Sequence, residues 1–504
     1  MSFCTVLSAA VQGLSVEMIR VEADVSNGLP MFHMVGYLSS EVKEASERVR
    51  TAIRNSGMKL PAKKIIVNLA PATVRKRGAS FDLPIALAVL AAMNYVPEEA
   101  LKGVAVIGEV SLEGKIRGVS GVLPIVMEAK NQGCTACILP EENEIEGRLV
   151  SGIKILPADN LEKLCAYLNG DEKEIHRKKQ GRSSAQRNIF ENKKEDFSDI
   201  CGQNAVKRAA EIAVAGGHNL LMAGPPGSGK SMIARRIATI LPELSLEESL
   251  EITRIYSVLG MIDKEQPLIT RRPFRSVHHT ITKTALVGGG MTPRPGEISM
   301  AHGGVLFLDE LAEFPRNVLE VLRQPLEEHQ IHIARNYGNF TFPAEFMLVA
   351  AMNPCPCGNY PDMQKCSCTP SQIQKYLGKI SQPFLDRMDL CIETPKVEYL
   401  ELDIERIGKK EEESSEVIRS RVVEARKLQK KRYEGTQIRT NSMLGPGEIR
   451  TYIPLGSAER KLMEKAFERM GLTARTYHKI LRVARTIADL DYSEKVTVSA
   501  LFGI

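Results

Sequence analysis

Residues 224–231 carry the spacing of a phosphate-binding loop, G-x-x-x-x-G-K-[ST]. An apolar run typical of a buried strand (His218–Ala223) precedes it, and a helical run (Met232–Leu241) follows. Glycines in such a loop let backbone N–H groups face an anion. We expect Lys230 to neutralise the β- and γ-phosphates of ATP and Ser231 to bind Mg²⁺. The predicted nucleotide-binding residues are Gly224, Pro225, Pro226, Gly227, Ser228, Gly229, Lys230 and Ser231.

Two further strands end on polar side chains that complete such a site. Residues 303–310 form an apolar run that ends in Asp309 and Glu310. An acidic pair after a strand often only favours a helix N-terminus. After a phosphate-binding loop, however, Asp309 is predicted to hold the Mg²⁺ shell, and Glu310 to orient the attacking water. Residues 346–352 end on Asn353, which could contact the γ-phosphate or serve only as a turn residue before Pro354.

The cysteines are clustered at one point of the chain. Cys355, Cys357, Cys366 and Cys368 form C-x-C-x₈-C-x-C in a loop rich in Pro and Gly. Four thiolates suit a structural zinc ion, which we favour over a reduced loop without metal. The remaining cysteines lie mostly in apolar runs and are interpreted as core residues: Cys4, Cys134, Cys137, Cys165, Cys201 and Cys391.

The composition is that of a folded protein of several domains. The chain has 504 residues, of which 43% are hydrophobic and 25% charged, with a formal charge of +6. That charge permits a nucleic-acid partner without requiring one. We see neither a transmembrane run nor a basic segment with an apolar core at the start, so we expect a cytoplasmic bacterial protein in a reducing compartment.

Changes in pattern along the chain predict the domains. Residues 1–170 alternate strands (15–22, 64–69, 104–110) with helical patterns such as 40–55. Residues 171–196 are polar and charged, which favours a solvated linker over a nucleic-acid tether. Residues 197–396 alternate strands and helices as a doubly wound α/β sheet does. Residues 397–504 predict a helical domain, with a charged helix in 401–433, a break at 445–447, and helices at 457–470 and 474–490.

Taken together, these motifs resemble the Mg-chelatase-like AAA+ ATPases, and within them the ComM/YifB branch. The resemblance rests on residues 224–231, 303–310, 352–358 and 383–390 and covers essentially the whole chain. It implies an α/β fold in three parts. These are an N-terminal Lon-protease-like α+β domain (ribosomal S5 domain 2-like), a central AAA+ P-loop sheet and a C-terminal helical lid.

The resemblance also assigns roles that the residues alone do not. It implies that Asn353 is sensor 1, that Arg387 is an arginine finger reaching a neighbouring subunit, and that Arg475 is sensor 2. A guanidinium placed against the γ-phosphate stabilises the charge of the transition state. A finger supplied by a neighbour makes hydrolysis depend on assembly, so the resemblance implies a ring, expected to be a homo-hexamer.

The N-terminal part is similar to the protease region of Lon, but its catalytic pair is broken. Ser80 falls near the position of Lon's serine, and a serine nucleophile needs an adjacent base. The position aligned with Lon's lysine is Leu123. We therefore expect no proteolysis, and a structural or binding role for Ser80.

Two basic segments resemble the DNA-facing insertions of this family. Residues 275–297 look like a helix-2 insert, and residues 330–342 look like a pre-sensor-1 hairpin that turns at 337–338. Lys283, Arg294 and Arg335 are candidate phosphate contacts in a pore. His278 and His279 are adjacent, so their rings are expected to point apart and not to share a metal.

The leading hypothesis is a ring ATPase that remodels single-stranded or branched DNA. Helicase-like branch migration in recombination and natural transformation is associated with the ComM branch, with recombination proteins as possible partners. One alternative is a chelatase-type motor for metal insertion into a tetrapyrrole, which this fused Lon-like domain disfavours. The other is a chaperone-like regulatory ATPase that acts on a protein partner.

Overall fold

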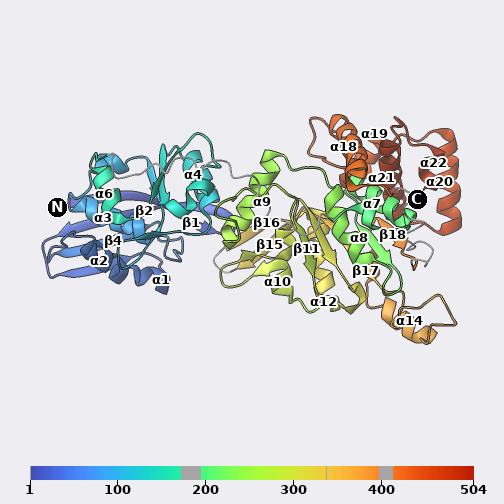
Figure 1. The fold of residues 1–504 in the computed structure, drawn as a ribbon, viewed down its shortest axis with the longest axis horizontal. Helices are drawn as coiled ribbons and strands as arrows, with labels where there is room; N and C mark the ends of the chain where they lie inside the picture. The colour runs from blue at the N-terminus through green and yellow to red at the C-terminus, as the bar shows by residue number, and fades with distance from the viewer. Residues whose placement is uncertain (1, 172–194, 336–337, 397–411, 504) are drawn as a thin grey trace.

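The computed structural model describes residues 2–171, 195–335, 338–396 and 412–503. Most of the predicted linker, residues 336–337 (which include Tyr337 of the predicted hairpin turn) and residues 397–411 lie outside this description. Among the described residues, no helix combines the length and the apolar character needed to cross a bilayer. Figure 1 shows three parts in a row: a blue N-terminal part, a green and yellow central part, and orange and red C-terminal helices.

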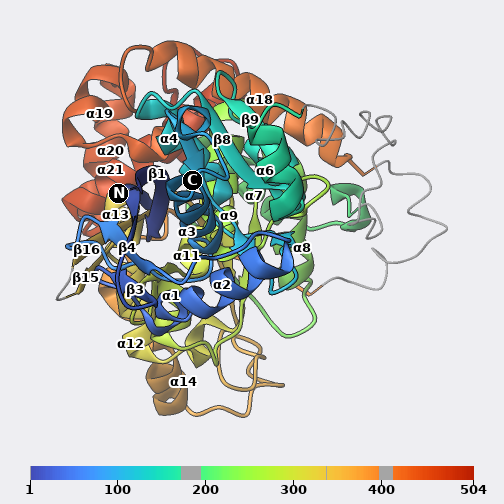
Figure 2. The same ribbon diagram turned by 90° about the vertical axis from the view of Figure 1, so that its left-hand side faces the viewer.

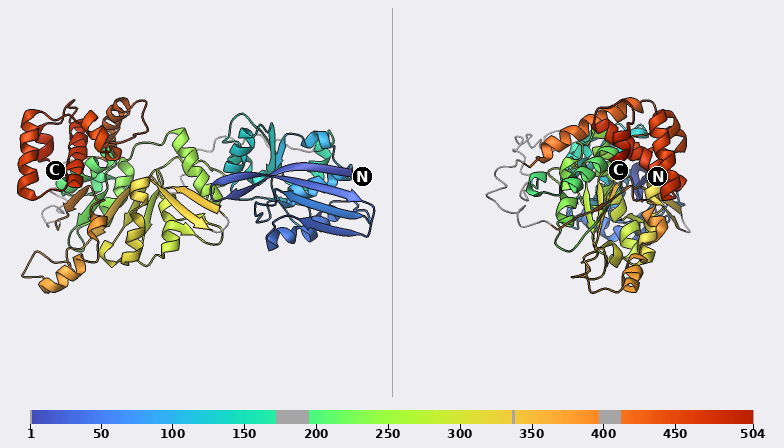
Figure 3. Two further views of the ribbon diagram at one scale, coloured as in Figure 1. Left: turned by 180° about the vertical axis from the view of Figure 1, so that it is seen from behind. Right: turned by 90° about the vertical axis from the view of Figure 1, so that its right-hand side faces the viewer.

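The N-terminal part is built on one mixed sheet with the strand order β3-β4-β2-β1-β5-β8-β9. Its longest strands, β1 (Ser2–Gln12) and β2 (Ser15–Ser26), pair antiparallel over their whole length and point toward the central part (Figure 3). The helix α3 (Asp82–Ala92) is buried along its entire length against this sheet. The other strands are β3 (Met31–Val35), β4 (Lys64–Ala70), β5 (Val104–Val106), β8 (Ala136–Pro140) and β9 (Lys154–Ala158).

Two elements of this part differ from the sequence prediction. The strand expected at 104–110 is interrupted at Gly108, which lies between β5 and β6 (Glu109–Val110). The interruption occurs because the Gly108 N–H donates to the Ser80 carbonyl. The helix expected at 40–55 is divided into α1 (Ser40–Lys43) and α2 (Ala45–Asn55). Figure 2 shows both helices beside β3, at the edge of the N-terminal sheet.

The central sheet is parallel, with the strand order β11-β14-β17-β10-β18. The carboxyl ends of its strands meet at one edge, and this is where the predicted loops converge. The predicted α/β architecture with a parallel sheet is confirmed. Its strands are β10 (Leu220–Ala223), β11 (Phe274–Val277), β14 (Val305–Leu308), β17 (Met347–Met352) and β18 (Leu390–Glu393).

The C-terminal helices share a hydrophobic core with the central part. Buried side chains of α18 (Ser415–Arg432) and α21 (Ala474–Leu490) join one cluster with α7 (Asn204–Gly216) and one face of the sheet. The helices predicted at 457–470 and 474–490 are present as α20 (Ser457–Met470) and α21. The expected break at 445–447 instead begins a helix, α19 (Pro446–Tyr452), because Gly445 caps it and proline is tolerated in a first turn.

The helix α9 (Leu246–Leu259) of the central part docks on the N-terminal part. Gly121 N–H donates to the Ser257 carbonyl at 2.9 Å, and Ser257 Oγ donates to Glu146 Oε1 at 2.6 Å. Glu146 Oε1 also accepts from the Leu123 N–H at 2.9 Å. Burial raises the pKa of Glu146. The two parts are therefore joined by a buried polar contact at Leu123, the residue predicted to align with Lon's lysine.

Candidate functional site

The loop 224–231 lies between β10 and α8 (Lys230–Ile237) at the carboxyl edge of the central sheet. Gly227 and Gly229 have φ values of 77° and 81°, a left-handed conformation that glycine adopts without strain. The loop thereby curls so that Lys230 begins the helix. This strand, loop and helix have the arrangement of a phosphate-binding site at a helix N-terminus.

The Lys230 ammonium points into the loop. Its Nζ donates to the carbonyls of Gly224 and Pro225 at 2.7 and 2.8 Å. It also lies 3.4 Å from Asn353 Oδ1, on the loop that follows β17. Burial lowers the pKa of Lys230, and the charge of Asp309 opposes that shift. The predicted phosphate-binding lysine and the predicted sensor amide are therefore neighbours.

Ser231 and Asp309 connect the two motifs expected to hold Mg²⁺. Ser231 Oγ donates to Asp309 Oδ2 at 2.6 Å, and the two residues are 78 positions apart in the chain. The contact forms because β10 and β14 flank β17 in the same parallel sheet. A hydroxyl beside a carboxylate offers oxygen ligands of the kind that Mg²⁺ prefers, so these residues fit the ion.

Glu310 follows Asp309 in a left-handed backbone conformation, with φ 54° and ψ 47°. Its N–H donates to Asp309 Oδ1 at 2.9 Å, and its Oε2 lies 3.1 Å from His279 Nδ1. A non-glycine residue at positive φ stores strain of about 1–3 kcal/mol, a feature common at active sites. The Glu310 carboxylate thus contacts the loop after β11.

The prediction that the rings of His278 and His279 point apart is wrong. Their ring centroids are 4.0 Å apart, because the two residues lie in the turn after β11 and not in a regular strand. Together with Glu310 they place possible ligand atoms within 4.8 Å of one another. Sequence reasoning missed His279 as a neighbour of Glu310, because strand periodicity does not extend into a turn.

Arg387 lies at the amino edge of the central sheet, where its parallel strands begin. Its carbonyl accepts from Asn219 Nδ2 at 2.9 Å, and Asn219 immediately precedes β10. The strand β18 begins after Arg387 and runs parallel to β10, with Leu390 paired with Leu220. Because the phosphate-binding loop follows the other end of β10, Arg387 is placed away from the phosphate site of its own chain.

Arg387 and Arg475 meet at one carboxylate oxygen. The Nη2 atoms of both residues donate to Glu327 Oε1, at 2.6 Å for Arg387 and 2.9 Å for Arg475. Arg387 comes from the turn before β18, Arg475 from the first turn of α21, and Glu327 from α13 (Pro325–Glu328). The Arg387 side chain is 7% exposed, whereas those of Glu327 and Arg475 are about half exposed. Sequence reasoning missed Glu327, because no motif marks it.

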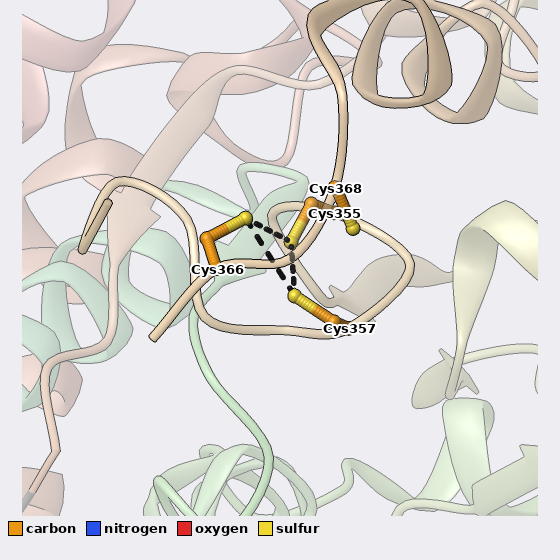
Figure 4. A group of neighbouring side chains, drawn as sticks. All are labelled: Cys355, Cys357, Cys366 and Cys368. Atoms are coloured by element: carbon orange, nitrogen blue, oxygen red, sulfur yellow. Dashed lines mark hydrogen bonds between the residues drawn. The ribbon is translucent and has the colours of Figure 1, made fainter. Parts of the chain in front are cut away.

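The four clustered cysteines converge (Figure 4). Their Sγ atoms all lie within 4.8 Å of one another, and those of Cys355, Cys357 and Cys366 are 3.4–3.8 Å apart. A tetrahedral zinc ion with bonds of about 2.3 Å separates its sulfur ligands by about 3.8 Å. Tyr360 N–H lies 3.4 Å from Cys355 Sγ, and a backbone N–H from Asn359 lowers the pKa of Cys357 to about 6. The spacing and donor set fit a Cys₄ metal site.

The cysteine loop touches the phosphate-binding loop. A Cβ placed on Gly358 would lie 2.3 Å from Pro226 Cδ, so the two loops are in direct contact there. Cys355 is also two residues after Asn353. The segment then continues into α14 (Pro370–Leu377), which Figure 1 shows at the periphery of the central part. The cysteine cluster therefore adjoins the predicted sensor on one side and the phosphate-binding loop on the other.

The three candidate DNA contacts are exposed. Lys283 begins α10 (Lys283–Val287), and Arg294 lies in β13 (Arg294–Pro295). Arg335 ends β15 (Gln330–Arg335), which pairs antiparallel with β16 (Gly338–Pro343) as the predicted hairpin. Arg335 Nε donates to the Gly290 carbonyl at 3.4 Å, so the hairpin and the insert are in contact. The structure thereby brings the two predicted DNA-facing segments together.

Leu123 and Ser80, the residues predicted to stand at the positions of Lon's catalytic pair, make structural contacts. Leu123 is fully buried, and its N–H is bonded to Glu146 as described above. Ser80 contributes its backbone carbonyl to the Gly108 N–H at 3.0 Å. A buried leucine supplies no base for a serine nucleophile.

Comparison with protein families gives three matches along the chain. Residues 196–402 match the family described as magnesium chelatase, subunit ChlI. Residues 21–143 match subunit ChlI of Mg-chelatase, and residues 412–502 match the magnesium chelatase, subunit ChlI C-terminal family.

Curated relatives match over nearly the full length. The uncharacterized protein YifB of Escherichia coli is 44% identical over 99% of this chain and 95% of its own. Competence protein ComM of Haemophilus influenzae is 42% identical over 98% of this chain and 95% of its own. Lon protease of Trichlorobacter lovleyi is 26% identical over 29% of this chain and 19% of its own length.

Proposed function

We propose that this chain, which belongs to the Mg-chelatase-like AAA+ family and to its ComM/YifB branch, is an ATP-hydrolysing motor that binds and remodels DNA. The family implies the ATPase activity together with ATP and Mg²⁺. The observation that carries the proposal is the hydrogen bond between Ser231 and Asp309, beside the Lys230 ammonium. The name of the competence relative supports DNA as the substrate, in recombination and natural transformation.

In this proposal each residue of the site has a separate task. Lys230 neutralises the β- and γ-phosphates, and the loop N–H groups orient them. Ser231 and Asp309 hold the Mg²⁺ ion, which supplies charge neutralisation when bound. Glu310 orients the attacking water and accepts its proton, while the Asn353 amide contacts the γ-phosphate or that water.

The active unit is a ring, expected to be a homo-hexamer. The place of Arg387 at the amino edge of the sheet supports its role as a finger for the neighbouring subunit, because it lies away from its own phosphate-binding loop. Arg475 accompanies Arg387 on Glu327, so the sensor 2 residue would be presented on the same side. A guanidinium delivered in this way stabilises the charge that develops in phosphoryl transfer.

Zinc in the Cys₄ cluster is a second component of the proposal. The convergence of Cys355, Cys357, Cys366 and Cys368 supports it. The ion would be structural, because four protein ligands leave no open position. It would fix the segment between Asn353 and the contact of Gly358 with Pro226.

DNA would contact the exposed insert and hairpin through Lys283, Arg294 and Arg335. Charged side chains on exposed loops contact a phosphate backbone without reading its sequence. Recombination proteins would be the partners of such a motor.

The competing function is a regulatory ATPase of the chelatase or chaperone type. The family descriptions support this competing function, because they name magnesium chelatase subunits.

The test is ATP hydrolysis with different effectors. We expect single-stranded or forked DNA to stimulate the ATPase, and porphyrin or unfolded polypeptide to leave it unchanged. Lys230→Ala controls for contaminating ATPases. Stimulation by porphyrin or polypeptide in place of DNA would favour the competing function. A wild-type ATPase that neither binds DNA nor responds to it would refute the DNA assignment.

A further inference from the structure

We propose that Arg75 and Arg77 of the N-terminal part extend the surface formed by the insert and the hairpin, so that one nucleic-acid strand contacts both parts of the chain. This inference rests on the proposed function, because the insert and hairpin are its candidate DNA contacts. The inference adds the segment that carries Arg75 and Arg77, which lies outside the ATPase motifs, to the nucleic-acid-binding surface.

Arg75 and Arg77 lie on one side of a fixed segment. Lys76 forms a parallel bridge with Leu38. Its N–H donates to the Tyr37 carbonyl at 2.9 Å, and its carbonyl accepts from the Ser39 N–H at 3.0 Å. Alternate residues of extended backbone point to opposite sides. Arg75 and Arg77 therefore share the side opposite to Lys76.

Lys76 is the anchor of this segment. Its side chain is buried, and its ammonium donates to the Pro71 carbonyl. Burial lowers the pKa of Lys76 to about 8. Because the residue is turned inward, it offers no charge to a ligand, and the two neighbouring arginines carry that role. The Arg75 guanidinium lies over the Tyr37 ring, 5.5 Å from its centroid.

Both arginines have donor capacity left over. Within the part of the chain that the structure describes, Arg75 Nε and Arg77 Nη2 are shielded from solvent and have no hydrogen-bond partner. The Glu41 carboxylate accepts a hydrogen bond from Ser39 Oγ, which lowers the pKa of Glu41, and the charges of Arg77 and Arg75 lower it further. Among the described residues no carboxylate lies within ion-pair distance of either guanidinium, so both positive charges remain available to attract an anion at this surface.

The segment is continuous with the predicted DNA-facing loops. Arg75 Nη1 lies 3.9 Å from Sδ of Met291, in the insert. The preceding residue, Gly290, accepts from Arg335 of the hairpin at 3.4 Å. A Cβ placed on Gly13 would lie 3.0 Å from Phe340, so the β1–β2 turn of the N-terminal part also packs on the hairpin. Figure 3 shows β1 and β2 reaching toward this hairpin.

The chemistry of this surface fits the backbone of a single strand. Arg75, Arg77, Arg294 and Arg335 supply guanidinium groups that match phosphate oxygens. Tyr37 is 45% exposed and Met291 is 70% exposed, which gives bases an aromatic ring and an apolar side chain to pack on. Basic side chains interleaved with an aromatic platform are typical of binding to single strands without sequence preference.

The experiment measures binding of a fluorescein-labelled oligothymidylate to the full chain at several salt concentrations. The double variant Arg75→Gln/Arg77→Gln removes both charges and keeps much of each side chain. We expect about tenfold weaker binding and a salt slope reduced by about 1.4, or about 0.7 for each lost phosphate contact. The variant Arg75→Lys/Arg77→Lys keeps the charges and should retain the wild-type slope. A defect in folding would affect both variants, because both lose the guanidinium groups.

The matched control is Lys154→Ala, which removes a charge from β9, at the opposite edge of the N-terminal sheet. Wild-type affinity and slope in the glutamine double variant would overturn the inference while leaving the proposed function intact. Failure of the wild-type chain to bind either this strand or forked DNA would instead refute the proposed function. Displacement of the strand by polyglutamate at equal charge concentration would assign the surface to acidic proteins and also overturn the inference.

Discussion

Ser231 Oγ donates a hydrogen bond of 2.6 Å to Asp309 Oδ2, and this contact joins the phosphate-binding loop to the acidic strand. Both residues stand at the carboxyl edge of a parallel sheet, on strands that flank β17. Asn353, at the end of that middle strand, lies 3.4 Å from Lys230 Nζ. The sheet therefore brings a cation, a hydroxyl, a carboxylate and an amide together at one edge.

Glu310→Gln separates hydrolysis from nucleotide binding. The amide cannot accept a proton from water, so we expect kcat to fall about 10²–10³-fold with little change in the affinity for ATP. The measurements are steady-state ATPase and binding of a fluorescent ATP analogue. Glu313→Gln, three residues along the chain, is the matched control and should behave as wild type. Equal kcat in the Glu310 and Glu313 variants would remove Glu310 from the mechanism.

The strand and loop patterns anticipated much of this site, and physical reasons explain the rest. The runs before Gly224, Asp309 and Asn353 predicted strands because each is apolar and ends on a polar residue. Because parallel strands align their carboxyl ends, these residues had to meet. Glu327 and His279 could not be found in this way. Their contacts depend on how α13, α21 and the turn after β11 are placed in space, which no local pattern records.

In the N-terminal part, too, local sequence patterns predicted the strands but not the contacts between distant residues. The alternation in β2 and β4 predicted strands, whereas the bend at Gly108 depends on a hydrogen bond to the distant Ser80 carbonyl. Similarly, Arg75 and Arg77 are an ordinary basic pair in the sequence. Their significance comes from the inward position of Lys76 and from the contact with Met291, 216 residues away.

Zinc content tests the cysteine cluster. We expect purified wild-type protein to contain about one zinc per chain by elemental analysis, and Cys355→Ser to contain almost none, because Cys355 contacts two other thiols of the cluster. The affinity for ATP should fall as well, since the loop contacts Pro226. Cys201→Ser, outside the cluster, should keep the metal. Wild-type protein prepared without chelators that contains no zinc would contradict this assignment.

Acidification should weaken the junction between β10 and α21 through His218. This fully buried imidazole lies 2.8 Å from Thr486 Oγ1, and burial lowers the pKa of His218 from 6.5 to about 4. The folded state therefore favours neutral His218, and the stability it contributes is complete above pH 6.5 and lost as the pH falls toward 4. The loss is about 1.4 kcal/mol per pH unit within this window.

Denaturant unfolding at a series of pH values measures this effect. We expect the stability of the wild type to fall more steeply than that of His218→Gln between pH 6.5 and 4, because the glutamine does not titrate. Other titrating groups are common to both proteins and cancel in the comparison. Parallel curves for the two proteins would show that His218 does not carry the acid sensitivity.

The central claim is that ATP lies between two subunits, with Lys230 from one and Arg387 from the next. The most direct test mixes Lys230→Ala with Arg387→Ala, after co-purification through separate tags has confirmed mixed assemblies. Each variant alone should lose about 10³-fold or more of the ATPase activity. In an equal mixture roughly a quarter of the interfaces combine an intact lysine with an intact arginine, so roughly a quarter of the wild-type activity should return. Mixed assemblies no more active than either variant would contradict the claim.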